Sequence, residues 1–143
     1  MRTYFAYGSN MWRAQMNRRC PGNVWLGQAG LPDYRWIISR RGYASIVASP
    51  GDDVYGIVYG LTPTDEQALD EYEGVASGSY LKRYLPVFTE GTYLTCLVYI
   101  DPIIAEGEPH AEYVHRINNG IRDARLPDEY VTRYIRPYIP LIP

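Results

Sequence analysis

Short runs of apolar and aromatic residues alternate with turns rich in Gly, Pro, Asp and Asn over the first part of the chain. Runs of β-branched and aromatic residues between such turns are typical of strands. The pattern predicts strands at 2–7, 23–29, 34–39, 44–48, 54–61, 80–88 and 92–100. Most of them should pair antiparallel with a neighbour in the chain, because the turns between them are short.

Two of these pairs have the form of hairpins. The turn cluster Ser49–Asp53 separates 44–48 from 54–61, and Glu90-Gly91 separates 80–88 from 92–100. Pro86 has no N–H to donate to a ladder, so it favours an edge or bulged position for the first strand of the second pair.

Helices are expected between and after the strands. Met11 to about Arg19 can form a helix that the Cys20-Pro21-Gly22 sequence ends. Thr64 and Gln67 have the spacing of a capping box, which predicts a helix from about 65 to 73 that stops at Gly74.

The last part of the chain has a different pattern. Apolar residues recur at helical spacing from His110 to about Asp123, and a further short helix is expected after Pro127. The segment 136–143 contains three prolines, so we expect an extended tail that packs on the protein or against a partner.

Together these elements predict an α+β fold: a small, mixed but mainly antiparallel, barrel-like sheet with a few short helices. A length of 143 residues is that of one compact domain, so we expect residues 1–143 to form a single domain with the tail at about 136–143.

Composition narrows the possible functions. The net charge of −2 and the pI near 5.6 disfavour nucleic acid and anionic membranes as partners. Long apolar stretches and a signal-peptide pattern are absent from the sequence, so we expect a cytoplasmic protein. Two cysteines, expected to be reduced, and two histidines give no metal-binding spacing, and no metal or cofactor is expected.

The first candidate for chemistry is the Gly8-Ser9-Asn10 turn between a strand and a helix. Such a turn presents backbone N–H groups at a helix N-terminus, where a carboxylate-sized anion is favoured. Ser9 and Asn10 are also ordinary N-cap residues, so a purely structural role is an alternative.

The second candidate is Glu73, at the predicted C-terminal end of its helix. The helix dipole, the nearby Asp70 and burial would each raise the pKa of its carboxyl group, as expected of an acid/base residue. The alternative is a solvated acidic helix face.

Two other features of the sequence allow more than one interpretation. The 15 tyrosines suit strands as well as a polar pocket. The pairs Arg18-Arg19 and Arg40-Arg41 are expected to be solvated or salt-bridged.

The motifs YFAYGSNM, PGDDVYGIVYGL, LDEYEG, SGSY and LPDEY occur in this order, and they resemble those of the γ-glutamylcyclotransferase family with its AIG2-like relatives. The resemblance implies a barrel-like α+β fold, a loop that binds a small γ-glutamyl substrate, and one catalytic glutamate, Glu73. It matches the binding loop to Tyr7, Gly8, Ser9, Asn10 and Met11, and family pocket tyrosines to Tyr80 and Tyr113.

The reaction implied by the resemblance is cyclisation of the substrate's own γ-glutamyl group to 5-oxoproline with release of an amine. Arg125 and the Pro-rich tail depart from the family pattern, so the group attached to the γ-glutamyl unit stays open: an amino acid, a polyamine, a protein lysine or a biosynthetic carrier. The oligomeric state is open as well. The alternative function is a non-catalytic module of the same fold that senses a γ-glutamyl metabolite or binds a protein partner.

Overall fold

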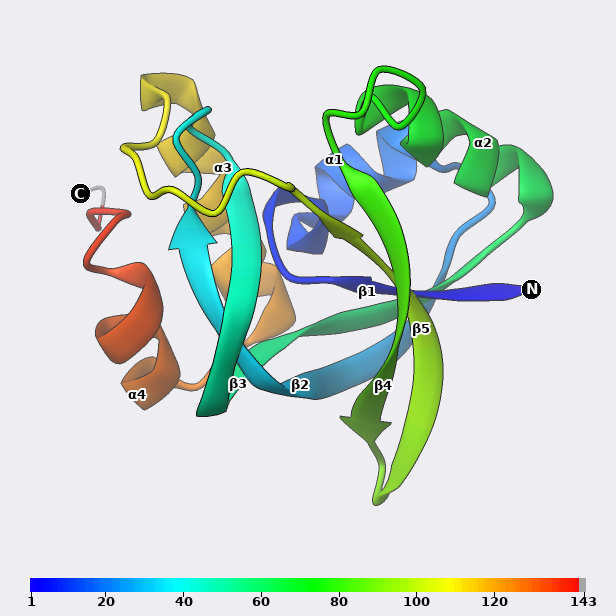
Figure 1. Ribbon diagram of the computed structural model, residues 1–143. Helices are drawn as coiled ribbons and strands as arrows, with labels where there is room; N and C mark the ends of the chain where they lie inside the picture. The colour runs from blue at the N-terminus through cyan, green and yellow to red at the C-terminus, as the bar shows by residue number, and fades with distance from the viewer. Residues whose placement is uncertain (142–143) are drawn as a thin grey trace.

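The computed structural model describes residues 1–141 and is built around a closed β-barrel with the strand order β1-β3-β2-β4-β5 (Figure 1). Its strands are β1 (Arg2–Ala6), β2 (Val24–Ile38), β3 (Ala44–Leu61), β4 (Leu81–Thr89) and β5 (Thr92–Ile100). Its helices are the 3₁₀ turn η1 (Ser9–Met11), α1 (Arg13–Arg19), α2 (Pro63–Tyr72), α3 (Ala111–Ala124), α4 (Asp128–Tyr130) and the π-helical η2 (Val131–Ile135). The mixed, barrel-like α+β prediction is confirmed.

The expected hairpin between 44–48 and 54–61 is wrong, because these residues belong to one long strand, β3. Ala48 pairs with Tyr34 and Asp53 pairs with Pro32, so residues 49–52 bulge out opposite Asp33 instead of reversing the chain. Asp33 has φ 66° and accepts a hydrogen bond from the Gly51 N–H at 3.0 Å, which holds the bulge. The two strands expected at 23–29 and 34–39 likewise merge into β2, and the true hairpin is β2–β3.

The hairpin formed by β4 and β5 is confirmed, with register from Leu81 opposite Ile100 to Thr89 opposite Thr92. Glu90 and Gly91 at its tip both have positive φ, as a tight two-residue turn requires. β4 pairs with β2 at Phe88, which lies opposite Gly30. Pro86 lies outside this β2–β4 pairing, so its missing N–H leaves no gap in the β2–β4 hydrogen bonds, as at the edge of a sheet.

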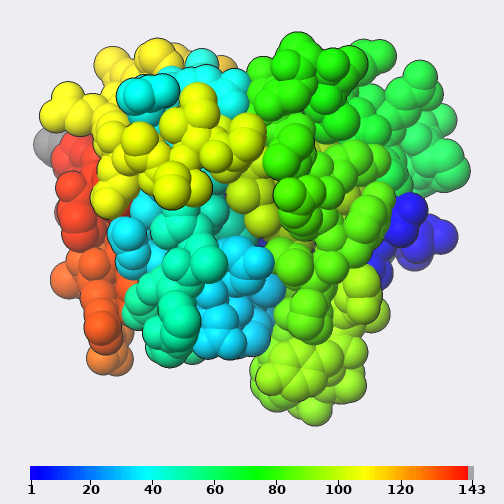
Figure 2. Space-filling view, in the orientation of Figure 1, coloured from blue at the N-terminus to red at the C-terminus, as the bar shows by residue number. Residues whose placement is uncertain are grey.

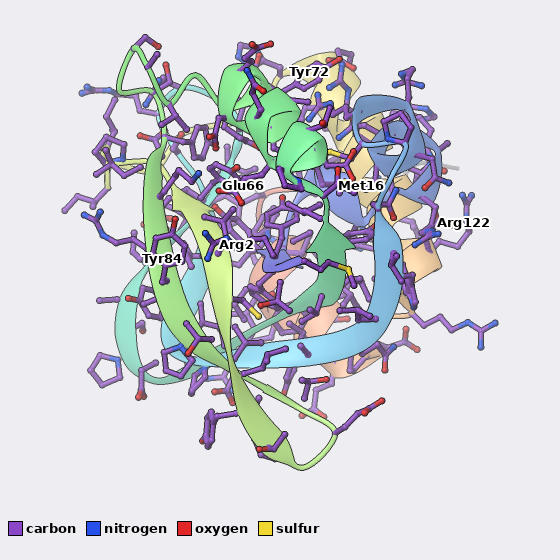
Figure 3. All side chains as sticks on the ribbon, turned by 90° about the vertical axis from the view of Figure 1, so that its right-hand side faces the viewer. Arg2, Met16, Glu66, Tyr72, Tyr84 and Arg122 are labelled. Atoms are coloured by element: carbon purple, nitrogen blue, oxygen red, sulfur yellow. The ribbon has the colours of Figure 1, made fainter. Side chains whose placement is uncertain are left out.

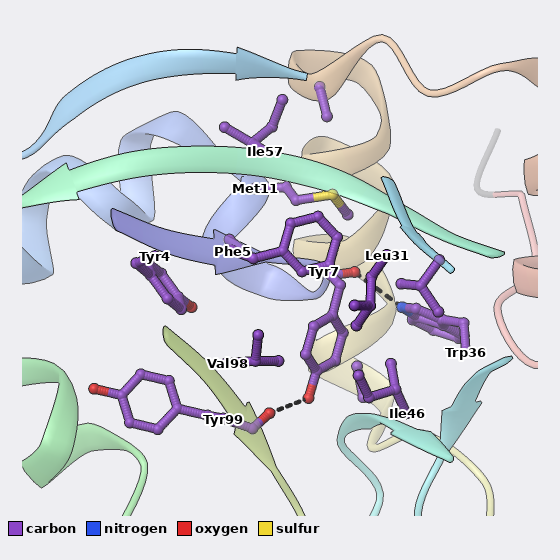
Figure 4. Packing of buried hydrophobic residues seen from close by; sticks show 14 of the residues in the cluster. Tyr4, Phe5, Tyr7, Met11, Leu31, Trp36, Ile46, Ile57, Val98 and Tyr99 are labelled. Atoms are coloured by element: carbon purple, nitrogen blue, oxygen red, sulfur yellow. Dashed lines mark hydrogen bonds between the residues drawn. The ribbon is translucent and has the colours of Figure 1, made fainter. Parts of the chain in front are cut away.

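β1 closes the barrel and leads directly to the Gly-Ser-Asn turn. It pairs antiparallel with β3, from Arg2 opposite Leu61 to Ala6 opposite Ile57, and parallel with β5 at Tyr4 opposite Leu97. Just after β1, the Tyr7 carbonyl accepts a hydrogen bond from Trp36 Nε1 at 2.9 Å, and the Tyr7 hydroxyl donates to the Tyr99 carbonyl at 2.5 Å (Figure 4). Both bonds are buried and fix the backbone where the turn begins.

The helix at 63–72 starts about two residues earlier than predicted, because Thr62 caps it and Thr64 does not. The Thr62 hydroxyl accepts from the Asp65 N–H, and the Asp65 carboxylate accepts from the Thr62 N–H. Pro63 at the first helical position is compatible with this start. The helix ends at Tyr72, so Glu73 becomes its C-terminal cap residue.

The helices after the barrel are confirmed, but the tail is not extended. Arg136–Tyr138 form turns that continue η2, and the Ile139 side chain is fully buried against the protein. Residues 142 and 143 lie outside the described part of the chain. None of the helices within residues 1–141 is long and apolar enough to cross a membrane.

Candidate active site

A cavity of about 340 Å³ opens where the end of β1, the start of α3 and the segment between α2 and β4 meet. The cavity is lined by Tyr4, Tyr7, Gly8, Ser9, Asn10, Arg19, Arg41, Tyr43, Ala44, Tyr72, Glu73, Gly74, Ser79, Tyr80, Tyr99, Glu112, Tyr113 and Arg116. Figure 2 shows the green surface of the α2–β4 segment against the cyan surface of the β2–β3 turn. Arg41 joins these two segments by a hydrogen bond from its Nη2 to the Ser79 carbonyl.

The Gly-Ser-Asn turn forms one wall of the cavity. The Met11 N–H donates to the Gly8 carbonyl at 3.1 Å, which closes the 3₁₀ turn. Within residues 1–141 the N–H groups of Gly8 and Asn10 donate to no other backbone group, whereas the Ser9 N–H donates toward the Tyr113 hydroxyl and lowers the pKa of that tyrosine. The N–H groups of Gly8 and Asn10 are therefore available to an anion or to a carbonyl oxygen in the cavity.

Ser9 and Asn10 do not cap a helix, although capping was the structural alternative for them. Neither η1 nor α1 has a side-chain cap. The buried Gln15 amide donates to Ser9 Oγ at 2.8 Å and to Asn10 Oδ1 at 2.9 Å, and Asn10 donates to the Tyr4 hydroxyl at 3.0 Å. The side chains of Ser9 and Asn10 thus stabilise the turn through hydrogen bonds to Gln15 and Tyr4.

Met11 is the one predicted loop residue that does not line the cavity. Its side chain is fully buried in the core beside Phe5 and Ile57 (Figure 4). Gly120 of α3 packs closely against it, since a Cβ added at Gly120 would lie 3.1 Å from the Met11 Cβ. Met11 anchors the turn to α3.

Glu73 lines the same cavity as the turn, and burial raises the pKa of its carboxyl group to about 7. The positive charge of Arg19 opposes this shift. Asp70, which we expected to contribute through its like charge, is instead paired with Lys82 Nζ at 3.1 Å and accepts the Tyr99 hydroxyl at 2.7 Å. A carboxyl group with a pKa near neutrality can both accept and donate a proton at physiological pH.

The remaining predicted residues, Tyr80 and Tyr113, hold the backbone of Ala44 on the opposite wall. The Tyr80 hydroxyl donates to the Ala44 carbonyl at 2.9 Å, and the Tyr113 hydroxyl accepts from the Ala44 N–H at 3.3 Å. Burial raises the pKa of Tyr113 to about 12 and that of Tyr80 further, so both stay protonated. Since Tyr113 accepts from Ala44, its own proton can be donated to a ligand.

Sequence reasoning did not single out Tyr4, Tyr99, Arg19, Arg41 or Arg116 as cavity residues. For Tyr4, the one sequence feature that could have indicated a place in the cavity is its position three residues before Tyr7, in a short strand that leads to the turn. The expectation of a salt bridge holds for Arg41, whose Nη2 lies 2.8 Å from Asp101 Oδ1.

The raised pKa of Glu73 predicts an effect on stability. Because its folded pKa lies above the ordinary value of 4.5, the unfolding free energy of the wild type should fall as the pH rises from 4.5 to about 7. Glu73→Gln removes this loss, so the variant should become more stable than the wild type above pH 7. Below about pH 4, where the carboxyl is neutral in both states, the two should be alike.

Chemical denaturation at several pH values measures this difference. Glu71→Gln is the control, because Glu71 is exposed on the same helix. An equal pH dependence for all three proteins would show that the Glu73 carboxyl is well solvated in the folded state.

Comparison with known proteins places the chain in a family. A family model described as "Gamma-glutamyl cyclotransferase, AIG2-like" matches residues 4–118, which include the whole wall of the cavity. The gamma-glutamylcyclotransferase of Mus musculus is 35% identical over 141 residues, covering 89% of this chain and 73% of the mouse protein. That of Homo sapiens is 33% identical over 138 residues with the same coverage. A solved structure of a gamma-glutamyl cyclotransferase superposes with a TM-score of 0.85 at 31% identity, covering 92% of this chain and 85% of that one. The chain therefore belongs to the AIG2-like gamma-glutamyl cyclotransferase family.

Proposed function

We propose that this protein is an enzyme that converts a γ-glutamyl amide into 5-oxoproline and a free amine or amino acid. The observation that carries the proposal is the position of Glu73, whose pKa is raised to about 7, in one cavity with the N–H groups of Gly8 and Asn10, which have no backbone acceptor within residues 1–141. A proton carrier thus lies in the same cavity as a cluster of oxyanion or carboxylate donors. Membership of the family supports the same reaction.

The first step is removal of a proton from the substrate's α-ammonium group. Ionised Glu73 takes the proton, and the free α-amine attacks the γ-carbonyl carbon of the same molecule. A new C–N bond closes the five-membered ring, and the carbonyl oxygen becomes an oxyanion. Because nucleophile and electrophile belong to one molecule, the protein contributes chiefly by holding the folded conformation, an effect that can reach about 10⁵ M or more in effective molarity.

In the second step the amide C–N bond breaks. Protonated Glu73 returns its proton to the leaving nitrogen, and the C–N bond breaks as the lactam carbonyl re-forms. The ring nitrogen still carries one proton too many, and ionised Glu73 passes this second proton to the released amine, so the products are 5-oxoproline and the amine in its ammonium form. The free N–H groups of the turn and the Tyr113 hydroxyl are the donors for the oxyanion or the substrate α-carboxylate. No covalent intermediate with the protein is needed.

The argument for a non-catalytic binding module is weaker than the sequence indicated. It was based on an apolar Pro-rich tail free to meet a partner, but Ile139 of that tail is buried within this chain. Arg136 further ties the tail to α3 by donating to Asn118 Oδ1 at 2.7 Å.

The test is incubation of the purified protein with a panel of γ-glutamyl amino acids and γ-glutamyl amines. We expect 5-oxoproline and free amine to appear in equal amounts, measured by chromatography. Folded protein that releases neither product from any member of the panel would contradict the proposal.

A further inference from the structure

Three arginines line the cavity, and two of them already have a matched charge. Arg41 Nη2 lies 2.8 Å from Asp101 Oδ1, and Arg116 Nη2 lies 2.8 Å from Glu112 Oε1. A guanidinium paired in this way has little attraction left for a further anion.

Arg19 differs from both. Within residues 1–141, no carboxylate oxygen lies within 4.0 Å of its guanidinium nitrogens. Its contacts are neutral: Nη1 donates to Asn10 Oδ1 at 3.2 Å, and the guanidinium carbon lies 4.5 Å from the centroid of the Tyr72 ring. A hydrogen bond and a stacked ring fix the group, and the charge of Glu73, with which Arg19 interacts, lies beyond ion-pair distance.

The two contacts also place Arg19 between the halves of the candidate active site. Asn10 belongs to the turn with the free N–H groups, and Tyr72 is the last residue of α2, directly before Glu73. Figure 3 shows Tyr72 near the outer end of α2, and its side chain is more than half exposed. Arg19 is itself half-buried and lines the same cavity as Glu73.

Resting on the proposed function, we infer that Arg19 binds a carboxylate group of the substrate. The planar guanidinium fork matches a carboxylate with two parallel hydrogen bonds, and a partly desolvated site strengthens this pairing. The γ-glutamyl group carries one carboxylate beside its α-amine. A leaving amino acid carries a second one next to the scissile amide, whereas a simple leaving amine carries none.

A matched pair of substrates separates these two sources. γ-Glutamyl-alanine and γ-glutamyl-ethylamide differ only by the carboxylate on the leaving group. We expect Arg19→Gln to raise the KM of at least one of them by about 10- to 100-fold. An equal rise for both identifies the carboxylate of the γ-glutamyl group, and a rise for γ-glutamyl-alanine alone identifies that of the leaving group.

Two further variants control for charge and folding. Arg19→Lys keeps the charge without the fork, so its KM should lie between those of the wild type and Arg19→Gln. Arg18→Gln makes the same change in charge on the exposed neighbouring residue of α1 and should leave KM unchanged. Circular dichroism establishes that each variant is folded.

An effect transmitted only through Glu73 gives a different result. Arg19 lowers the pKa of Glu73, so its loss should move the acid limb of the pH profile upward whether or not it binds substrate. Kinetics are therefore compared on the alkaline plateau of each variant's own pH profile, where Glu73 is ionised. A shifted acid limb with KM unchanged for both substrates would overturn the inference.

A failure of the proposed function can be distinguished from a failure of the Arg19 inference. If the wild type turns over neither substrate, titration calorimetry with γ-glutamyl-alanine decides the matter independently. Weaker binding to Arg19→Gln than to the wild type would then support the carboxylate contact without catalysis, and equal or absent binding would reject it.

Discussion

Glu73→Gln is expected to lower the rate of 5-oxoproline release by about 10²- to 10⁴-fold, the usual loss when a general acid/base is removed. The amide has the size and shape of the carboxyl group but can neither take a proton from the α-ammonium nor return one to the leaving nitrogen. The change should appear in kcat, because the N–H donors of the turn are untouched.

The pH profile of the wild type checks the same residue. With the pKa of Glu73 raised to about 7, kcat/KM should rise with pH and level off above that value, because the ionised form is the base. Glu71→Gln, on the exposed face two residues earlier, should behave as the wild type. Activity of Glu73→Gln within a few-fold of the wild type would mean that another group transfers the proton.

Gly56→Ala is expected to destabilise the protein by about 3 kcal/mol or more, because backbone occupies the place of the new methyl group. A Cβ at this position would lie 2.1 Å from the Ala6 carbonyl oxygen and 3.0 Å from the Ala6 carbonyl carbon. Relief requires β1 to move away from β3, which would open the barrel and displace the turn that begins two residues after Ala6.

Gly60→Ala is the matched control on the same strand. Its Cβ would meet the Met1 side chain, at 2.0 Å from the sulfur, but Met1 is 80% exposed and free to turn away. Thermal or denaturant unfolding should therefore show a large loss for Gly56→Ala and a small one for Gly60→Ala. Equal losses would show that β1 adapts its position easily.

The local chemistry of the chain predicted those features that depend on neighbours in sequence. The β4–β5 hairpin follows from Glu90-Gly91, and α3 follows from apolar residues at helical spacing. The sequence does not separate Thr62 from Thr64 as the cap of α2, because both are followed three residues later by a side chain that can complete a capping box. The structure selects Thr62, since Asp65 is buried, donates its N–H to the Thr62 hydroxyl and accepts from the Gly22 N–H. The bulge at residues 49–52 carries the residues of a turn, so it was indistinguishable from a hairpin until β2 was seen beside it.

The cavity itself depends on contacts between distant segments. Gly8 and Glu73 could be selected individually, the former as part of a strand–helix turn and the latter from its position at a helix end. The cause of the raised pKa of Glu73 could not, since it is burial by walls from several elements. That Arg19 has no carboxylate within ion-pair distance among residues 1–141 is equally invisible in the Arg18-Arg19 sequence, because it emerges only once the partners of Arg41 and Arg116 are known.

The pairing of β1 with β3 and β5 has a consequence for the order of folding. The Tyr7 hydroxyl bond to Tyr99 joins residues 92 positions apart, and Tyr113, which holds the opposite wall, comes later still. During synthesis β1 can therefore complete its pairing only after β3 and β5 have been made. Such non-local closure is typical of folding on the millisecond-to-second scale. The cavity walls are therefore expected to come together only when the barrel closes, because they come from the same distant segments.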